Sequence, residues 1–221
     1  MSTQLCFPMT LAIALACVPC PSMAQPVFEQ PTYLPGDWWQ YNYVSESDGT
    51  SGQFWRRIER IFSDDRIEVR ASNGRTEYFD GTMNYVGEKP EDQPRVFVKF
   101  PLHVGDSWTF VRQYEDNPQA GEQGWVEVVG FERITVPAGA FDCFRIEIRN
   151  SGTSQMGTTD THLTQWHCPL VKWLAREIRD VRVTVKYGLG QHLHQISELT
   201  RYTPGQTRTP PAQTEEERAA R

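Results

Sequence analysis

Residues 141–168 read FDCFRIEIRNSGTSQMGTTDTHLTQWHC and carry the clearest structural signal in the chain. From Phe144 to Arg149, apolar and charged residues alternate strictly, which places the apolar side chains on one face of a β-strand. Turn-forming residues fill positions 151–157, and a second run of strand-forming residues ends at Cys168. The segment therefore predicts an antiparallel β-hairpin.

Cys143 and Cys168 fit this hairpin, and they are the only cysteines outside residues 1–24. Directly opposed residues in an antiparallel pair have a constant index sum. If the two cysteines oppose each other, the hairpin centre falls between Gln155 and Met156, inside the turn-rich stretch. We therefore predict a cross-strand disulfide that stabilises the fold by roughly 3 kcal/mol. Two free thiols are the alternative, and a redox-active pair is disfavoured because no Cys-x-x-Cys motif is present.

The same register places Arg145 opposite Trp166, on the face that carries the cysteines. This predicts a possible ligand face in which a cation–π pair lines a concave surface. An ordinary exposed cross-strand pair is the alternative.

Outside the hairpin, short aromatic and β-branched runs separated by turn residues continue from residue 36 to residue 202. We expect a single all-β domain built on one antiparallel, strongly curved sheet, a half-barrel or a barrel of about 10–12 strands. Residues 171–180 fit either helical or strand spacing and are predicted as a strand. Residues 25–35 are expected to form an extended lead-in, and residues 203–221 a disordered tail.

The halves 36–99 and 100–202 resemble each other. Gly36-Asp37 precedes a tryptophan strand in the first, and Gly105-Asp106 does so in the second. We hypothesise that each half supplies about five strands to one sheet, with loops taking up the length differences. Chance recurrence of common strand dipeptides is the alternative.

Residues 1–24 contain no Asp, Glu, Lys or Arg, and an apolar run at 11–18 is followed by Ser22-Met23-Ala24. This pattern predicts a signal peptide cleaved after Ala24. The run is too short to cross a bilayer, so the mature chain is expected to have no transmembrane segment. The expected destination is the periplasm, with secretion as the alternative, and lipoprotein processing at Cys17 is disfavoured.

The net charge of −6 argues against nucleic acid as a partner and against electrostatic attraction to an anionic bilayer. The chain contains no His-Glu-x-x-His, Gly-x-Ser-x-Gly or phosphate-binding glycine-rich motif. No catalytic residue and no cofactor are therefore predicted. His192 and His194 would share one face of a strand, which makes them weak metal candidates that lack further ligands.

Three segments carry a family resemblance: FPLHVGDSW at 100–108, VPAGAFD at 136–142 and QWHCPLVKW at 165–173. The chain resembles the TapB-like family of exported bacterial all-β proteins of unknown function, most clearly over residues 100–178. It departs from the family pattern at Ala140, where Thr is usual, and at His167-Cys168, where Tyr and a small residue are common. The resemblance implies a curved antiparallel sheet and export, and it implies no catalytic residues.

The leading functional hypothesis is a non-catalytic exported module whose aromatic-rich sheet binds a small apolar ligand or an envelope protein. One alternative is a hydrolase-like enzyme with a dispersed site. The other is a structural accessory of an envelope or secretion complex that binds its partner through a sheet edge.

Overall fold

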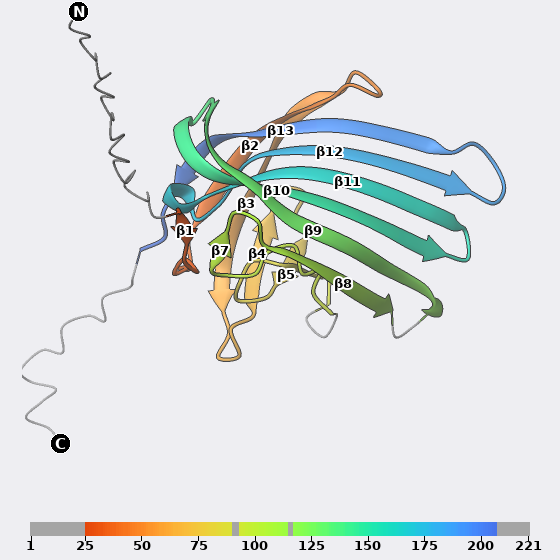
Figure 1. The fold of residues 1–221 in the computed structure, drawn as a ribbon, viewed down its shortest axis with the longest axis horizontal. Helices are drawn as coiled ribbons and strands as arrows, with labels where there is room; N and C mark the ends of the chain where they lie inside the picture. Colours follow the sequence, from red (N-terminus) through yellow and green to blue (C-terminus); the bar gives the residue numbers. More distant parts are fainter. Residues whose placement is uncertain (1–24, 90–92, 115–116, 207–221) are drawn as a thin grey trace, which may run out of the picture.

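The computed structural model describes residues 25–89, 93–114 and 117–206 (Figure 1). The predicted leader, residues 1–24, and residues 207–221 of the predicted tail lie outside these ranges. The first residues of that tail are held in place, which differs from the prediction. Thr203 ends the last strand, and the Gly205 N–H donates a hydrogen bond to Asp37 Oδ1 at 2.8 Å.

Eleven strands form one antiparallel sheet, which confirms the predicted all-β class. They lie in the order β6-β5-β4-β3-β2-β13-β12-β11-β10-β9-β8, and β1 pairs separately with β7. Among the described residues the helical content is a single 3-10 turn, η1 (Pro169–Val171). The strands are β1 (Val27–Phe28), β2 (Trp38–Ser45), β3 (Ser51–Ile61), β4 (Ile67–Ala71), β5 (Thr76–Phe79), β6 (Tyr85–Gly87), β7 (Leu102–His103), β8 (Ser107–Tyr114), β9 (Asn117–Val136), β10 (Gly139–Ser154), β11 (Gly157–Cys168), β12 (Trp173–Val185) and β13 (Gln191–Thr203).

The sheet is open, because its outermost strands, β6 and β8, are not paired with each other. The two edges nevertheless approach one another, since Arg112 Nη2 on β8 donates to the Val86 carbonyl on β6 at 2.6 Å. In Figure 1 the long strands β9–β13 run side by side toward one end of the molecule, and β1 and η1 lie at the opposite end. The architecture is a strongly curved open sheet rather than a closed barrel.

The stretch at 171–180 contributes to strand β12, as predicted, and a β-bulge explains its helix-like spacing. His167 pairs with Leu174 and Trp166 with Arg176, which leaves Ala175 unpaired. A bulge shifts the alternation of faces by one residue. Residues whose side chains lie on the same face are therefore three positions apart in the sequence at this bulge, as they are on one side of a helix.

Two five-stranded meanders, β2–β6 and β8–β12, flank β13. Each begins with the same turn, in which a glycine of positive φ precedes an aspartate. In each turn, the glycine N–H donates a hydrogen bond of 2.8 Å to the carbonyl of a residue on the next strand. The N–H of this partner residue donates a hydrogen bond of 2.9 Å to the aspartate carbonyl. The residues are Gly36, Asp37 and Ile58 in the first half, and Gly105, Asp106 and Val128 in the second.

One face of the sheet, here called the inner face, carries the core. Phe144, Ile146 and Ile148 are alternate residues of β10 on this face, and all three are fully buried. Val98 and Leu102, from the segment between β6 and β8, pack against them. This segment therefore covers part of the inner face and replaces solvent with apolar contacts. The opposite face of the sheet is called the outer face.

Candidate functional site

A cavity of about 310 Å³ lies between the inner face and the segment that covers it. Aromatic rings form much of its wall. They belong to Tyr41, Phe54, Phe79, Tyr85, Phe97 and Trp173. We call this space the inner cavity.

The rings are packed against one another, so the wall has a defined shape. Phe79 meets Trp173 edge-on, with ring centroids 5.7 Å apart, and Tyr41 stacks on Phe54 at 5.0 Å. The guanidinium of Arg56 lies over the rings of Phe54 and Trp173, at 5.4 and 5.8 Å from their centroids. A flat apolar molecule could contact ring faces and edges here.

Three polar side chains line one side of the inner cavity: Gln165 and His167, which are buried, and Glu177, whose side chain is 12% exposed. Gln165 Nε2 lies 2.6 Å from Glu177 Oε2, and Gln165 Oε1 lies 3.0 Å from His167 Nε2. Because the Gln165 amide donates to the carboxylate, its oxygen is left to accept from His167 Nε2. The other imidazole nitrogen, Nδ1, is then a hydrogen-bond acceptor, and no described residue donates to it.

Burial lowers the pKa of His167 to about 3, with Glu177 opposing this shift, so the imidazole is neutral near pH 7. Burial by itself would raise the pKa of Glu177. The charge of Arg179 and the hydrogen bond from Gln165 outweigh that effect, and the pKa is lowered overall. The cavity thus contains an ionised carboxylate beside a neutral histidine.

Each arginine that lines the inner cavity is paired with a glutamate. Arg56 Nε donates to Glu77 at 2.7 Å, and Arg179 Nε donates to Glu177 at 3.0 Å. Arg95 Nε donates to Glu122 at 2.6 Å. Since these charges are already compensated, the cavity favours an uncharged molecule over an ion.

A second cavity of about 390 Å³ continues along the inner face. We call it the outer cavity; it is distinct from the outer face of the sheet. It shares Arg95, Phe97 and Arg179 with the inner cavity, so these three side chains separate the two spaces. Its wall has fewer rings and more small or hydroxyl-bearing residues, among them Gly152 and Ser154. The two cavities together form one trough along the inner face.

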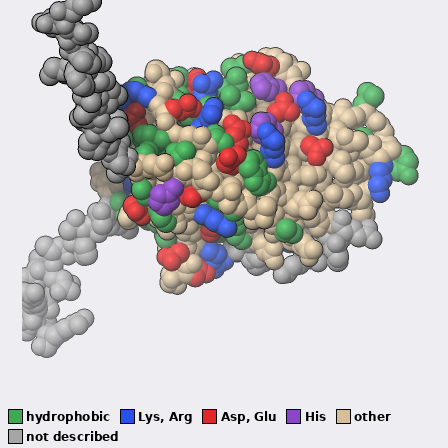
Figure 2. All heavy atoms as spheres, viewed as in Figure 1, with side chains coloured by type: hydrophobic (Ala, Val, Ile, Leu, Met, Phe, Trp, Pro, Cys, Tyr) green, Lys and Arg blue, Asp and Glu red, His purple; other side chains and the backbone are tan. Residues whose placement is uncertain are grey.

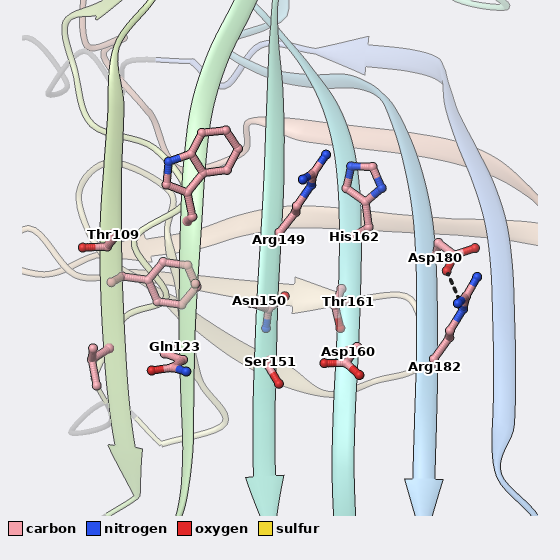
Figure 3. A pocket seen from close by; sticks show the side chains of 14 residues that line it. Thr109, Gln123, Arg149, Asn150, Ser151, Asp160, Thr161, His162, Asp180 and Arg182 are labelled. Carbon is pink, nitrogen blue, oxygen red and sulfur yellow. Dashed lines mark ion pairs between the residues drawn. The ribbon is translucent and has the colours of Figure 1, made fainter.

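The outer face carries a depression of about 820 Å³ of different character (Figure 3). Arg149, His162 and Asp180 occupy opposed positions on β10, β11 and β12. Figure 3 shows their polar side chains side by side, with the Asp180–Arg182 ion pair at 3.7 Å. Here polar groups meet open solvent, whereas the inner cavity encloses them.

The predicted ligand-face pair, Arg145 and Trp166, is correctly opposed, and it lines none of the three cavities described above. Trp166 is 7% exposed, and its Nε1 donates to Glu132 of the β9–β10 hairpin at 2.7 Å. The cation over its ring is Arg176, at 5.3 Å, rather than Arg145. The β9–β10 hairpin therefore contacts Trp166, whereas the Arg145 side chain is 40% exposed, and a ligand role for this pair stays a prediction.

The other predicted pair, Cys143 and Cys168, is joined by a disulfide in the expected register. Both residues are fully buried, and their Cα atoms are 4.2 Å apart. The bridge lies next to Trp166 and fastens β10 to β11 at the end of the sheet opposite the hairpin turn. No ligand role follows for it.

His192 and His194 share the outer face and converge on Asp180. His192 Nε2 lies 2.9 Å from Asp180 Oδ2, and His194 Nδ1 lies 3.4 Å from the same oxygen. These hydrogen bonds, that of His192 above all, lower the pKa of the Asp180 carboxyl. Figure 2 shows histidines gathered among charged side chains on this face. In the part of the chain that the structure describes, no group of three or more His, Cys, Asp or Glu residues could hold a metal ion.

The sequence analysis missed the inner-cavity residues, although the hairpin register contained a signal for two of them. The register places Gln165 and His167 on the face opposite to that of their neighbour Trp166. The apolar residues of β10 lie on this same face. Polar residues on an apolar face point to a buried site. Arg56, Glu77 and Arg95 come from distant segments, and no local pattern connects them.

No protein-family model and no curated protein matches the chain. Three solved structures are similar in fold at low identity. A candidate exported protein with a YmcC-like fold from Bacteroides fragilis is 17% identical, with a TM-score of 0.43, over 81% of this chain and 100% of that one. A candidate lipoprotein from Parabacteroides distasonis is 14% identical, with a TM-score of 0.42, over 80% and 97%. The hypothetical lipoprotein YmcC from Escherichia coli is 11% identical, with a TM-score of 0.43, over 77% and 86%.

Within the described ranges, none of the helical structure has the length and apolar character needed to cross a bilayer. The resemblance to the TapB-like family stays a prediction from sequence.

Proposed function

We propose that this chain is an exported, non-catalytic binding module whose inner cavity holds a small, flat, uncharged apolar or aromatic molecule. The observation that carries the proposal is a cavity walled by six aromatic rings, which His167 also lines. His167 Nε2 is engaged by Gln165, and no described residue donates to His167 Nδ1. We expect the ligand to present a hydrogen-bond donor, such as an N–H or O–H group, to this nitrogen.

Size and charge agree with this ligand class. The volume of about 310 Å³ is at the lower end of the range of small-molecule pockets, about 300–1,000 Å³. The paired arginines and glutamates described above leave no charge for an ionic ligand to neutralise. Export is supported by the predicted leader and by the disulfide, which forms in oxidising compartments.

The test uses N-phenyl-1-naphthylamine, an uncharged aromatic amine whose fluorescence rises in apolar surroundings and whose N–H can donate to His167. Titration of the mature chain, residues 25–221, should show saturable binding. Ser197→Phe should abolish it, because Ser197 lines the cavity and is only 5% exposed. Ser151→Phe, on the outer face of β10, is the matched control and should bind as the wild type does.

If Ser197→Phe does not fold, Leu174→Trp fills the same cavity from a partly exposed position. His167→Leu keeps an apolar wall but removes the acceptor, so it should weaken binding by about tenfold, as for one lost hydrogen bond. Wild-type protein that binds no probe, or a cavity-filled variant that binds as tightly as wild type, contradicts the proposal.

A further inference from the structure

Three of the most exposed apolar side chains lie at the tips of two neighbouring hairpins. Met156 is 74% exposed in the β10–β11 turn, and Tyr187 and Leu189 are 91% and 94% exposed in the β12–β13 turn. The Lys186 N–H donates to the Met156 carbonyl at 3.0 Å, so the two tips are joined. Figure 1 shows both turns at the end of the molecule far from β1, which we call the distal end.

Carboxylates are absent from both of these hairpin tips. Residues 151–159 and 183–191 contain no Asp or Glu and one lysine, Lys186, although the whole chain has 28 acidic residues. In Figure 2, hydrophobic side chains and a basic side chain project from this end. The distal tips are thus apolar, unlike the acidic remainder of the molecule.

We propose that the distal tips insert into the interfacial region of a lipid bilayer. Tyr, Leu and Met gain free energy when they leave water, and Tyr prefers the headgroup level of a membrane. A lysine beside them can remain among the headgroups. The β10–β11 tip closes a regular hairpin, with Ser154 paired to Gly157, and the Lys186 N–H of the other tip is bonded to the Met156 carbonyl, so shallow insertion leaves these backbone groups paired.

The position of the outer cavity supports a membrane over a protein surface as the occupant. Gly152, Ser154 and Gly157 of the β10–β11 hairpin line this cavity, which continues to the inner cavity past Arg95 and Arg179. Docked tips would bring its mouth to the lipid surface, where apolar molecules concentrate. This route for the ligand rests on the proposed function, whereas the docking surface stands on exposure and charge alone.

The experiment is sedimentation of the mature chain with phosphatidylcholine vesicles. The wild type should partition onto them. Met156→Ser, Tyr187→Ser and Leu189→Ser combined should lower the partition coefficient by at least about tenfold, because three buried side chains are lost. The matched control combines Val27→Ser, Val44→Ser and Leu170→Ser, three apolar residues exposed elsewhere, and should stay within about twofold of the wild type.

Folding of each variant is checked by circular dichroism, and the tip changes should leave binding of N-phenyl-1-naphthylamine in lipid-free buffer unaltered. If the triple tip variant does not fold, Leu189→Cys carrying a polarity-sensitive dye should show a blue shift on vesicles. The docking proposal is overturned if the wild-type protein does not bind phosphatidylcholine vesicles, or if it binds only vesicles of anionic lipid. Probe binding without vesicle binding refutes docking alone, and vesicle binding without probe binding refutes the ligand cavity alone.

Discussion

The two five-stranded halves share a beginning and differ in length. Both start with the same glycine–aspartate turn, yet β4, β5 and β6 have 5, 4 and 3 residues, whereas β10, β11 and β12 have 16, 12 and 13. The shared turns set how each meander enters the sheet. The additional length in the second half builds the outer cavity and contributes to the distal tips, whereas both halves line the inner cavity.

The aspartates of the shared turns make the sharpest test of this comparison. Asp37 is fully buried, and its carboxylate accepts hydrogen bonds from Lys172, Tyr202 and Gly205. The equivalent Asp106 has a side chain that is 43% exposed. Asp37→Ala should lower the free energy of unfolding by about 3–5 kcal/mol, because it leaves a largely buried lysine unpaired. Asp106→Ala should cost about 1 kcal/mol or less.

Urea denaturation of both variants measures these losses. If both variants lose a similar free energy of unfolding, the shared turn, and not the additional contacts of Asp37, determines how much Asp37 contributes to stability.

The disulfide is the next largest expected effect, and it has no counterpart in the first half. Cys143→Ala combined with Cys168→Ala should reduce stability by about 3 kcal/mol, since the bridge restricts the unfolded chain. The measurement is the denaturation midpoint with and without reductant. Reductant should shift the wild-type midpoint and leave the double variant unchanged. A wild-type denaturation midpoint that does not change with reductant would contradict a structural role for the disulfide.

The two equivalent tryptophans, Trp39 and Trp108, should differ by a smaller amount. Trp39 Nε1 donates to Val171 O, and Trp108 Nε1 donates to Val96 O, both at 2.8 Å, but only Trp39 is fully buried. Trp39→Phe should cost about 2 kcal/mol, because a buried carbonyl loses its donor and a void remains. Trp108→Phe should cost about half as much. Equal denaturation midpoints for the two variants would remove this distinction between the halves.

The last expected effect is a dependence of stability on pH, and it belongs to the second half. The pKa of His167 is about 3 in the folded chain, against 6.5 for an ordinary histidine. Between these values the unfolded chain binds a proton that the folded chain does not, so stability falls as pH decreases from 6.5 toward 3. The slope from this residue is at most about 1.4 kcal/mol per pH unit.

His167→Gln keeps a donor for Gln165 but cannot be protonated in this range. Denaturation at a series of pH values should therefore show a shallower slope for the variant than for the wild type. Identical slopes would mean that His167 is protonated in the folded chain.

Local pattern was sufficient to predict the strands, the hairpin register and the cysteine pair, because each depends on residues close in sequence or on one antiparallel register. The cavity could not be predicted in this way. Its wall joins Arg56 of β3, Phe97 of an irregular segment and Glu177 of β12, and their meeting depends on how the whole sheet curves. Trp166 shows the same limit, since pairing alone did not indicate that the β9–β10 hairpin would contact it.

We propose that the ligand binds on the inner face and not in the larger depression on the outer face. A crystal structure of the mature chain grown with N-phenyl-1-naphthylamine tests it most directly. We expect density for the probe inside the inner cavity, against the rings of Phe79 and Trp173, with its N–H directed at His167 Nδ1. Probe density confined to the outer-face depression beside Arg149 and His162, with the inner cavity filled by water alone, would contradict it.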